Sequence, residues 1–94
     1  LIADRGRTFL LEVKGDSMIE AHIEEGDLVV AERASTARDG DIVVAEVDGE
    51  FTLKFLKKLG DRVWLEPANK NFKPIYPKQS LRIAAIVKGV VRKY

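Results

Sequence analysis

The sequence predicts a small, mostly β single domain with a barrel-like sheet and one short helical turn. Short segments alternate apolar with polar residues, as half-buried strands do, and glycine-aspartate or aspartate-glycine pairs separate them. No stretch sustains the 3.6-residue period of a long helix, so we expect no helix-turn-helix. Because 94 residues can bury one core and no second module, residues 1–94 are predicted to form one domain.

The first predicted strand covers residues 8–14, where apolar residues occupy every second position. Gly15 then allows a tight turn. A short helical-looking segment follows at residues 18–23, and we expect its first two side chains, Met18 and Ile19, to lie in the core.

The next part of the chain repeats one kind of turn. The pair Gly26-Asp27 recurs as Gly40-Asp41, and each pair precedes an apolar strand, so we expect two similar entries into one barrel-like sheet. Shared turn chemistry is the preferred explanation for this likeness, since two units are too few for a solenoid. Asp48-Gly49 predicts a hairpin between strands at residues 42–47 and 50–59.

A further strand is expected at residues 62–66, and Pro67 ends it. Residues 68–79 contain two more prolines and several apolar side chains, so they are predicted to form an ordered loop. The residues expected to pin this loop are Phe72, Ile75 and Tyr76.

The closing strand is predicted at residues 80–94, which are dense in β-branched side chains. Gly89 interrupts the run and indicates a bulge or bend. A long final strand can lie at the edge of a sheet. At the other end, residues 1–7 are expected to be an extended lead-in.

Composition excludes several classes of function. With 16 basic and 15 acidic side chains, the net charge of +1 gives no electrostatic footprint for nucleic acid or an anionic membrane. The absence of cysteine excludes a disulfide and thiolate catalysis, and it suits a reducing cytosol. We expect no metal and no cofactor, because the chain has one histidine and no carboxylate cluster. The longest apolar run, residues 83–87, is far below the ~20 residues of a membrane span, so we expect a cytoplasmic protein.

Ser17 and Lys54 are the candidate catalytic pair. Ser17 follows a turn after an apolar strand, where a nucleophile would be accessible, and the one histidine, His22, is an unlikely base within its acidic run. Lys54 lies in the apolar segment 51–56, where desolvation would lower its pKa toward that of a useful base. The period of two puts Thr52 on the same strand face, where its hydroxyl can hold the amine. The alternative is a turn serine and an edge-strand lysine without chemistry.

Five short motifs give this pair a context. They occur in the order seen in the C-terminal domain of the LexA repressor family, which residues 9–94 closely resemble. This family includes UmuD and phage repressors of the CI type. The motifs are Gly15-Asp16-Ser17-Met18, Glu25-Gly26-Asp27-Leu28-Val29, Asp39-Gly40-Asp41-Ile42-Val43, Thr52-Leu53-Lys54-Phe55-Leu56-Lys57-Lys58 and Glu66-Pro67-Ala68-Asn69.

The resemblance implies a LexA-type protease fold and a self-cleaving serine endopeptidase. It implies that Ser17 is the nucleophile, that Lys54 is the general base and that Thr52 orients Lys54. Backbone amides near Asp16 and Ser17 would hold the oxyanion, with Met18 as a supporting neighbour. The Asp16 side chain itself is expected to be an N-cap of the following turn.

The resemblance also implies partners. The family forms homodimers through its closing strand, cleaves an Ala-Gly type bond in its own chain, and responds to RecA filaments on single-stranded DNA. Operator DNA would be bound only by an N-terminal domain outside these residues. The chain starts at Leu1 without an initiator methionine, so we expect a fragment of a longer protein. No glycine follows an alanine or cysteine here, and the cleavage site is therefore expected upstream.

Three other interpretations stay open at this stage. Type I signal peptidases share a similar Gly-Asp-Ser-Met motif and a lysine base, but they need a membrane anchor, and none is visible. A non-catalytic dimerisation domain of a phage-type repressor would retain Ser17 and Lys54 only as relics. A small oligonucleotide-binding barrel is disfavoured by the near-neutral charge and the few clustered aromatic residues.

Overall fold

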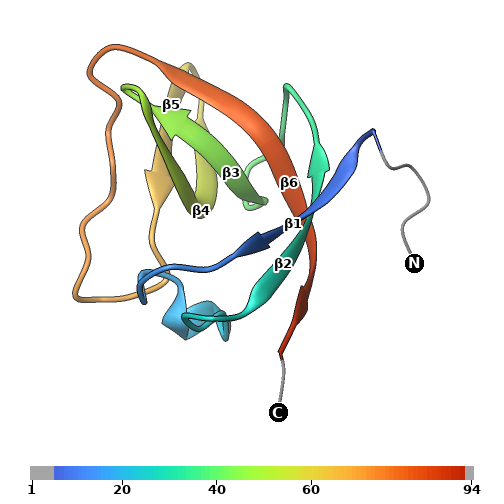
Figure 1. The fold of residues 1–94 in the computed structure, drawn as a ribbon. Coiled ribbons are helices and arrows are strands. Elements are labelled where there is room, and N and C mark those ends of the chain that lie inside the picture. Colours follow the sequence, from blue (N-terminus) through green and yellow to red (C-terminus); the bar gives the residue numbers. More distant parts are fainter. Residues whose placement is uncertain (1–5, 93–94) are drawn as a thin grey trace.

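Strands account for most of the described chain, which confirms the mostly β prediction (Figure 1). The computed structural model describes residues 6–92. The outer parts of the predicted lead-in and of the predicted closing strand, residues 1–5 and 93–94, lie outside the described residues. In chain order the elements are β1 (Thr8–Glu12), the 3₁₀ turn η1 (Ile19–Ala21), β2 (Leu28–Arg33), β3 (Ile42–Val47), β4 (Glu50–Leu59), β5 (Arg62–Glu66) and β6 (Leu81–Val91).

All six strands belong to one antiparallel sheet in the order β1-β2-β6-β3-β4-β5. The sheet twists strongly, so that β1 crosses in front of β2 and β6 in Figure 1, while the β3–β4 hairpin curls over from the other end. Side chains of β1 and of this hairpin line one pocket, where the candidate site lies.

The curved sheet is open and does not close into a complete barrel. Within residues 6–92 no pairing joins the outer strands β1 and β5. The free edge of β5 is instead used by Ile75, which forms an isolated antiparallel bridge with Leu65. Their backbone N–H and C=O groups exchange hydrogen bonds of 3.0 and 2.8 Å. These bonds occupy the edge positions of β5 that closure of a barrel would require.

The closing strand β6 lies inside the sheet, which corrects the expectation of a final strand at its edge. It lies between β2 and β3, although its two halves have different neighbours. Residues 81–83 pair only with β3, and residues 87–91 pair only with β2. In the pairing of β2 with β6, Val30 lies opposite Gly89 and Ala31 lies opposite Val87, so Lys88 has no partner on β2. This irregularity beside Gly89 confirms the predicted bulge.

The two glycine-aspartate turns have the same structure. Asp27 and Asp41 each accept a hydrogen bond from the backbone N–H three positions earlier, at 2.8 and 2.9 Å. Gly26 and Gly40 adopt φ values of 92° and 91°, which a residue with a side chain rarely adopts. The predicted β3–β4 hairpin is also confirmed, with positive φ at both Asp48 and Gly49, as a type I′ turn requires.

Three side chains differ from their predicted positions. Ile19 is exposed, because the single turn η1 is anchored by the residues on either side of it, Met18 and Ile23, each 2% exposed. In the loop after β5, Ile75 is partly buried as expected, but Phe72 and Tyr76 are exposed. The bridge to β5 turns Ile75 inward, so the side chain that follows it faces outward.

The buried side chains form clusters on the two sides of the curled sheet. One cluster includes Leu56 and Leu65. Another brings Val13, Met18 and Ile23 against Val29. This second cluster fixes the segment that carries Ser17 to the sheet.

Candidate active site

Ser17 lies on a short connection between β1 and η1 that is anchored on both sides. Val13 and Met18, 6% and 2% exposed, pack into the core before and after it. Gly15 adopts a φ of 76°, so the chain can turn sharply between these anchors. Ser17 itself is half-buried, which leaves its hydroxyl within reach of solvent and of a substrate.

Lys54 lies in the middle of β4, and only 8% of the residue is exposed. Burial lowers the pKa of Lys54 below its ordinary value, because the charged ammonium loses solvation. Its Nζ donates a 2.6 Å hydrogen bond to Oγ1 of Thr52. The predicted same-face relationship of Thr52 and Lys54 and the predicted direction of the pKa shift are therefore confirmed.

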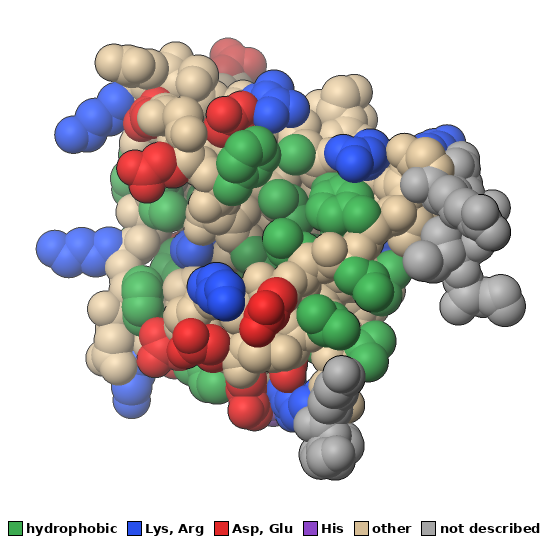
Figure 2. All heavy atoms as spheres, in the orientation of Figure 1, with side chains coloured by type: hydrophobic (Ala, Val, Ile, Leu, Met, Phe, Trp, Pro, Cys, Tyr) green, Lys and Arg blue, Asp and Glu red, His purple; other side chains and the backbone are tan. Residues whose placement is uncertain are grey.

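Ser17 and Lys54 line the same pocket, which has a volume of about 600 Å³. Met18 and Thr52 line it too, whereas Asp16 and the exposed His22 do not. Figure 2 shows hydrophobic side chains gathered in the middle of this face, between β1 and the β3–β4 hairpin. Besides Met18, the apolar residues of the pocket wall are Phe9, Leu11, Val13, Val44, Phe51, Leu53 and Ala84.

The serine and the lysine share this pocket without a direct bond. Among residues 6–92 no hydrogen bond joins the Ser17 hydroxyl to Lys54, whose amine is held by Thr52. A hydroxyl and a desolvated amine beside an apolar groove can act on an extended peptide once that peptide excludes water from the groove.

Charged groups surround the apolar part of the pocket. The guanidinium of Arg33 lies 4.8 Å from the ring centre of Phe9, and that of Arg82 lies 5.8 Å from the ring centre of Phe51. Arg82 also pairs with Glu46 at 2.8 Å.

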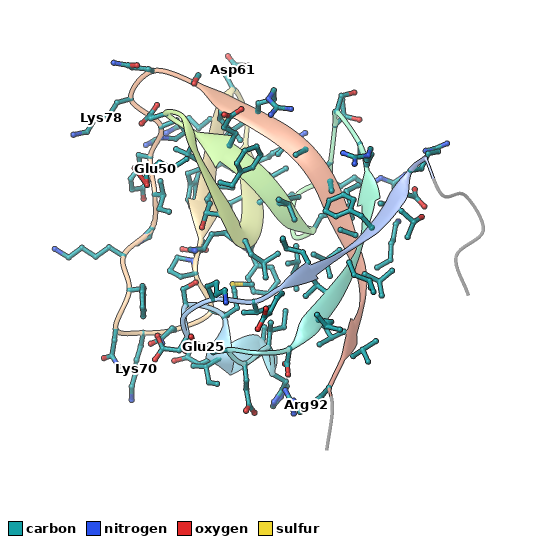
Figure 3. All side chains as sticks on the ribbon, viewed as in Figure 1. Glu25, Glu50, Asp61, Lys70, Lys78 and Arg92 are labelled. Atoms are coloured by element: carbon teal, nitrogen blue, oxygen red, sulfur yellow. The ribbon has the colours of Figure 1, made fainter. Side chains whose placement is uncertain are left out.

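Six charged residues labelled in Figure 3 lie around the outside of the domain: Glu25, Glu50, Asp61, Lys70, Lys78 and Arg92.

The expected N-cap role of the Asp16 side chain is wrong. The N-cap residue of η1 is Met18, and no side chain makes a capping hydrogen bond there. The backbone carbonyl of Asp16 accepts from the Ile19 N–H instead, at 3.3 Å, and so supplies the contact that a cap would have made.

No role was predicted for Asn69, although it ends the Glu66-Pro67-Ala68-Asn69 motif. Asn69 is 7% exposed, and its Nδ2 donates to the Asp16 carbonyl at 2.8 Å. The sequence did contain a signal for this contact, namely a polar amide two positions after the proline that ends β5. Buried side-chain amides are normally hydrogen-bonded, often to backbone groups.

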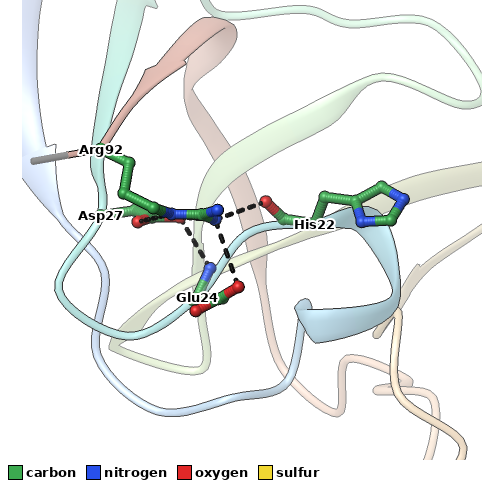
Figure 4. Close-up of polar contacts among 4 residues, drawn as sticks. All are labelled: His22, Glu24, Asp27 and Arg92. Carbon is green, nitrogen blue, oxygen red and sulfur yellow. Dashed lines mark hydrogen bonds and ion pairs between the residues drawn. The ribbon is translucent and has the colours of Figure 1, made fainter. Parts of the chain in front are cut away.

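Sequence reasoning also missed a polar network behind the site. The Arg92 guanidinium donates to both carboxylate oxygens of Asp27 and to the His22 carbonyl, and it lies 3.5 Å from a carboxylate oxygen of Glu24 (Figure 4). The Arg92 hydrogen bonds and the Glu24 backbone N–H lower the pKa of Asp27 to about 2. This network joins the end of β6 to the turn that precedes β2.

The open β-sheet thus carries a serine and a buried lysine on one apolar pocket, and both are residue types that serine peptidases can use in catalysis. The chain belongs to the Peptidase S24-like family, which matches residues 1–91.

The most similar proteins include several LexA repressors. The chain is 45% identical to the LexA repressor of Cereibacter sphaeroides over 96 aligned positions, which cover 100% of the chain and 42% of that protein. It is 52% identical to the one of Thermotoga petrophila over 86 positions, covering 90% of the chain and 44% of that protein. The one of Leptospira biflexa is 44% identical over 93 positions, covering 99% and 46%. These matches confirm the resemblance to the LexA family, and the chain spans less than half the length of these curated relatives.

One negative observation concerns membranes. No helix within the described range, residues 6–92, has the length and apolar character needed to cross a bilayer.

Proposed function

We propose that this chain is the peptidase and dimerisation part of a LexA-type repressor of the SOS response, and that it cuts its own longer chain at an Ala-Gly type bond. The observation that carries the proposal is the shared pocket of Ser17 and Lys54, in which burial lowers the pKa of the lysine. Membership of the Peptidase S24-like family and the likeness to LexA repressors support it.

The proposed chemistry begins with a neutral Lys54. Its Nζ takes the proton of the Ser17 hydroxyl while Oγ forms a bond to the scissile carbonyl carbon, and the C=O electron pair moves onto the oxygen. Backbone N–H groups near Asp16 and Ser17 hold the resulting oxyanion. Collapse of this intermediate breaks the C–N bond, and the Lys54 ammonium protonates the leaving amine.

The remaining acyl ester is then hydrolysed. Lys54, neutral again, takes a proton from water as the water oxygen bonds to the ester carbon. Loss of the Ser17 oxygen as the leaving group, with return of the proton, regenerates the serine and releases a carboxylic acid. Both steps use one serine and one base, and neither needs a cofactor.

The proposed partners follow from the resemblance to the LexA family that the sequence motifs carry. We place the protein in the cytoplasm as a homodimer, with cleavage stimulated by a RecA filament on single-stranded DNA. Operator DNA would be bound by an N-terminal domain beyond these residues. The alternatives are a non-catalytic dimerisation domain of a phage-type repressor and a signal-peptidase-like protease that acts on other chains.

The test is cleavage of a peptide that carries an Ala-Gly bond, by the chain and by its Ser17→Ala variant. We expect the wild type to cleave the peptide and Ser17→Ala to be inactive while retaining its fold, since one half-buried hydroxyl contributes little to stability. Ser80→Ala, which removes an exposed hydroxyl, is the matched control and should cleave normally. An intact wild-type domain that never cleaves would favour the non-catalytic alternative.

A further inference from the structure

Two segments far apart in the sequence hold each other beside Ser17. The turn around η1, light blue in Figure 1, lies against the start of the loop that follows β5. The Ala68 N–H donates to the Ser17 carbonyl at 2.8 Å, and the Glu20 N–H donates to the Ala68 carbonyl at 2.7 Å. The Lys70 N–H donates to a carboxylate oxygen of Glu20 at 2.8 Å. We call these contacts, together with the two side-chain hydrogen bonds of Asn69, the serine clamp.

Asn69 supplies the one side-chain amide of the serine clamp, and both ends of that amide are used. Its Oδ1 accepts from the Asn71 N–H at 2.9 Å, and its Nδ2 donates to the Asp16 carbonyl at 2.8 Å. Since a backbone N–H can only donate and a carbonyl can only accept, these two partners determine which end of the amide is nitrogen. The Asn69 side chain is therefore fixed in one orientation.

The Asp16 carbonyl belongs to the same peptide group as the Ser17 N–H. A peptide group is planar and trans, so its C=O and its N–H point in opposite directions. A donor that holds the carbonyl from the Asn69 side therefore sets the direction of the Ser17 N–H on the other side. The next peptide group is held as well, because the Ser17 carbonyl accepts from the Ala68 N–H.

We propose that Asn69 is a positioning residue of the peptidase, which acts by fixing the Asp16–Ser17 peptide so that the Ser17 N–H is aimed at the oxyanion. This inference rests on the proposed function. Donors that are fixed before the reaction stabilise developing charge most strongly, because they need no reorganisation in the transition state. A hydrogen bond to the carbonyl also polarises the peptide, which strengthens its N–H as a donor.

The residue type fits this role. An aspartate at position 69 would keep the acceptor for Asn71 but would turn a carboxylate oxygen toward the Asp16 carbonyl, where two acceptors repel. An alanine would leave the Asp16 carbonyl with only the longer 3.3 Å bond from Ile19. Both changes free the peptide while leaving the serine hydroxyl and the lysine in place.

The test uses the 94-residue chain, a peptide with an Ala-Gly bond, and the variants Asn69→Asp and Asn69→Ala. We expect kcat to fall by about 10- to 100-fold, less than the ~10²–10³-fold loss seen when an oxyanion donor itself is removed. KM should stay within about twofold, because the interaction is made with the transition state and not with the bound substrate. The midpoint of the pH–rate profile should not move, because Asn69 does not contact Lys54.

Two further variants keep the test decisive if the buried position tolerates no change. Asn71→Asp is the matched control, since it makes the same chemical change at an exposed residue two positions on, and it should retain full activity. Glu20→Ala removes the exposed end of the serine clamp without touching the core, and its kcat should fall a few-fold at constant KM.

The outcomes separate the two proposals. Full kcat in folded Asn69→Asp, or in Glu20→Ala if the Asn69 variants unfold, would overturn the positioning role while wild-type cleavage upheld the peptidase. A KM increase at constant kcat would also overturn it, because that pattern indicates a general loss of binding. A wild type without Ser17-dependent cleavage would overturn the proposed function, and the role of Asn69 with it.

Discussion

The side-chain nitrogen of Lys54 lies 2.6 Å from the hydroxyl oxygen of Thr52, two positions earlier on the same strand. Two opposing effects therefore act on the lysine. Burial disfavours the ammonium and lowers the pKa of Lys54, whereas a hydrogen-bond acceptor beside the ammonium favours it. Burial is the stronger effect, so the pKa of Lys54 is lowered. The hydrogen bond to Thr52 limits the size of this decrease and holds the amine in one place.

Cleavage should depend on pH through Lys54. The rate is expected to rise about tenfold per pH unit from about pH 6 and to reach a plateau at the apparent pKa of the lysine, below the ordinary value of about 10.4. Lys54→Ala should be inactive across this range, and so should Lys54→Arg, because a guanidinium does not lose its proton. The measurement is the first-order cleavage rate of each variant at closely spaced pH values.

Lys57→Ala is the control for this prediction, since Lys57 lies on the same strand and does not line the Ser17 pocket. Activity in Lys54→Ala together with a loss in Lys57→Ala would mean that the base has been misassigned. A flat profile in the wild type would show instead that a conformational step limits the rate.

Replacing the acceptor should shift the same profile in a defined direction. Thr52→Val keeps the shape of the side chain but removes the oxygen that stabilises the Lys54 ammonium, so the pKa of Lys54 should fall further. The midpoint of the pH–rate profile should move to lower pH, while the plateau falls because the amine is no longer held. A midpoint that moves to higher pH would contradict this account of the pair.

Local rules predicted the part of the fold on which this pair depends. The β3–β4 hairpin follows from an Asp-Gly turn. The bounds of β4 and β5 follow from the alternation of apolar and polar residues and from the proline that ends β5. Each of these signals lies within a few residues of the chain. The same alternation placed Thr52 beside Lys54. Residue chemistry paired Ser17 with Lys54, and the family resemblance supported the pairing. Their common pocket depends on how β1 crosses the sheet, which the local sequence pattern does not predict.

Pairings between distant residues were the part that sequence reasoning could not predict. The bridge from Ile75 to the edge of β5 keeps the sheet open, and the insertion of β6 between β2 and β3 turns an expected edge into an interior strand. The serine clamp has the same origin, since Asn69 and Asp16 are separated by 53 positions. Single-residue preferences carry no information about such contacts.

The Asp27–Arg92 pair should make stability depend on pH. The pKa of Asp27 is about 2 in the folded chain and is expected to be about 3.9 when unfolded. A lowered folded pKa means that the contribution is complete above the unfolded value and is lost as the pH falls from about 4 to about 2. Asp27→Asn should therefore lower Tm at pH 7, and the difference from the wild type should shrink across that window.

Asp41→Asn is the matched control, because Asp41 makes the equivalent turn contact with the Arg38 N–H and has no arginine partner in residues 6–92. Its effect on Tm at pH 7 should be smaller. Thermal unfolding of the three proteins between pH 7 and pH 2 measures both effects. A Tm difference for Asp27→Asn that stays constant down to pH 2 would contradict an ionic contribution from this pair.

The proposed homodimer can be tested at the half of β6 that has one neighbour. Residues 87–91 pair with β2 alone, so among residues 6–92 their other edge has no strand partner. Val90 and Val91 are 42% and 49% exposed there. An isologous contact between two such edges would pair backbone groups and cover these side chains in one step.

Val90→Lys should therefore convert the dimer to a monomer, since it would place a charge, and by symmetry a second one, inside the new interface. Val63→Lys is the matched control, because Val63 is 37% exposed on β5, away from this edge, and the variant should stay dimeric. Sedimentation at tens of micromolar distinguishes the two states. A wild type that sediments as a monomer, or a Val90→Lys variant that remains a dimer, would remove this edge as the interface, because a lysine could not be buried there without a partner for its charge.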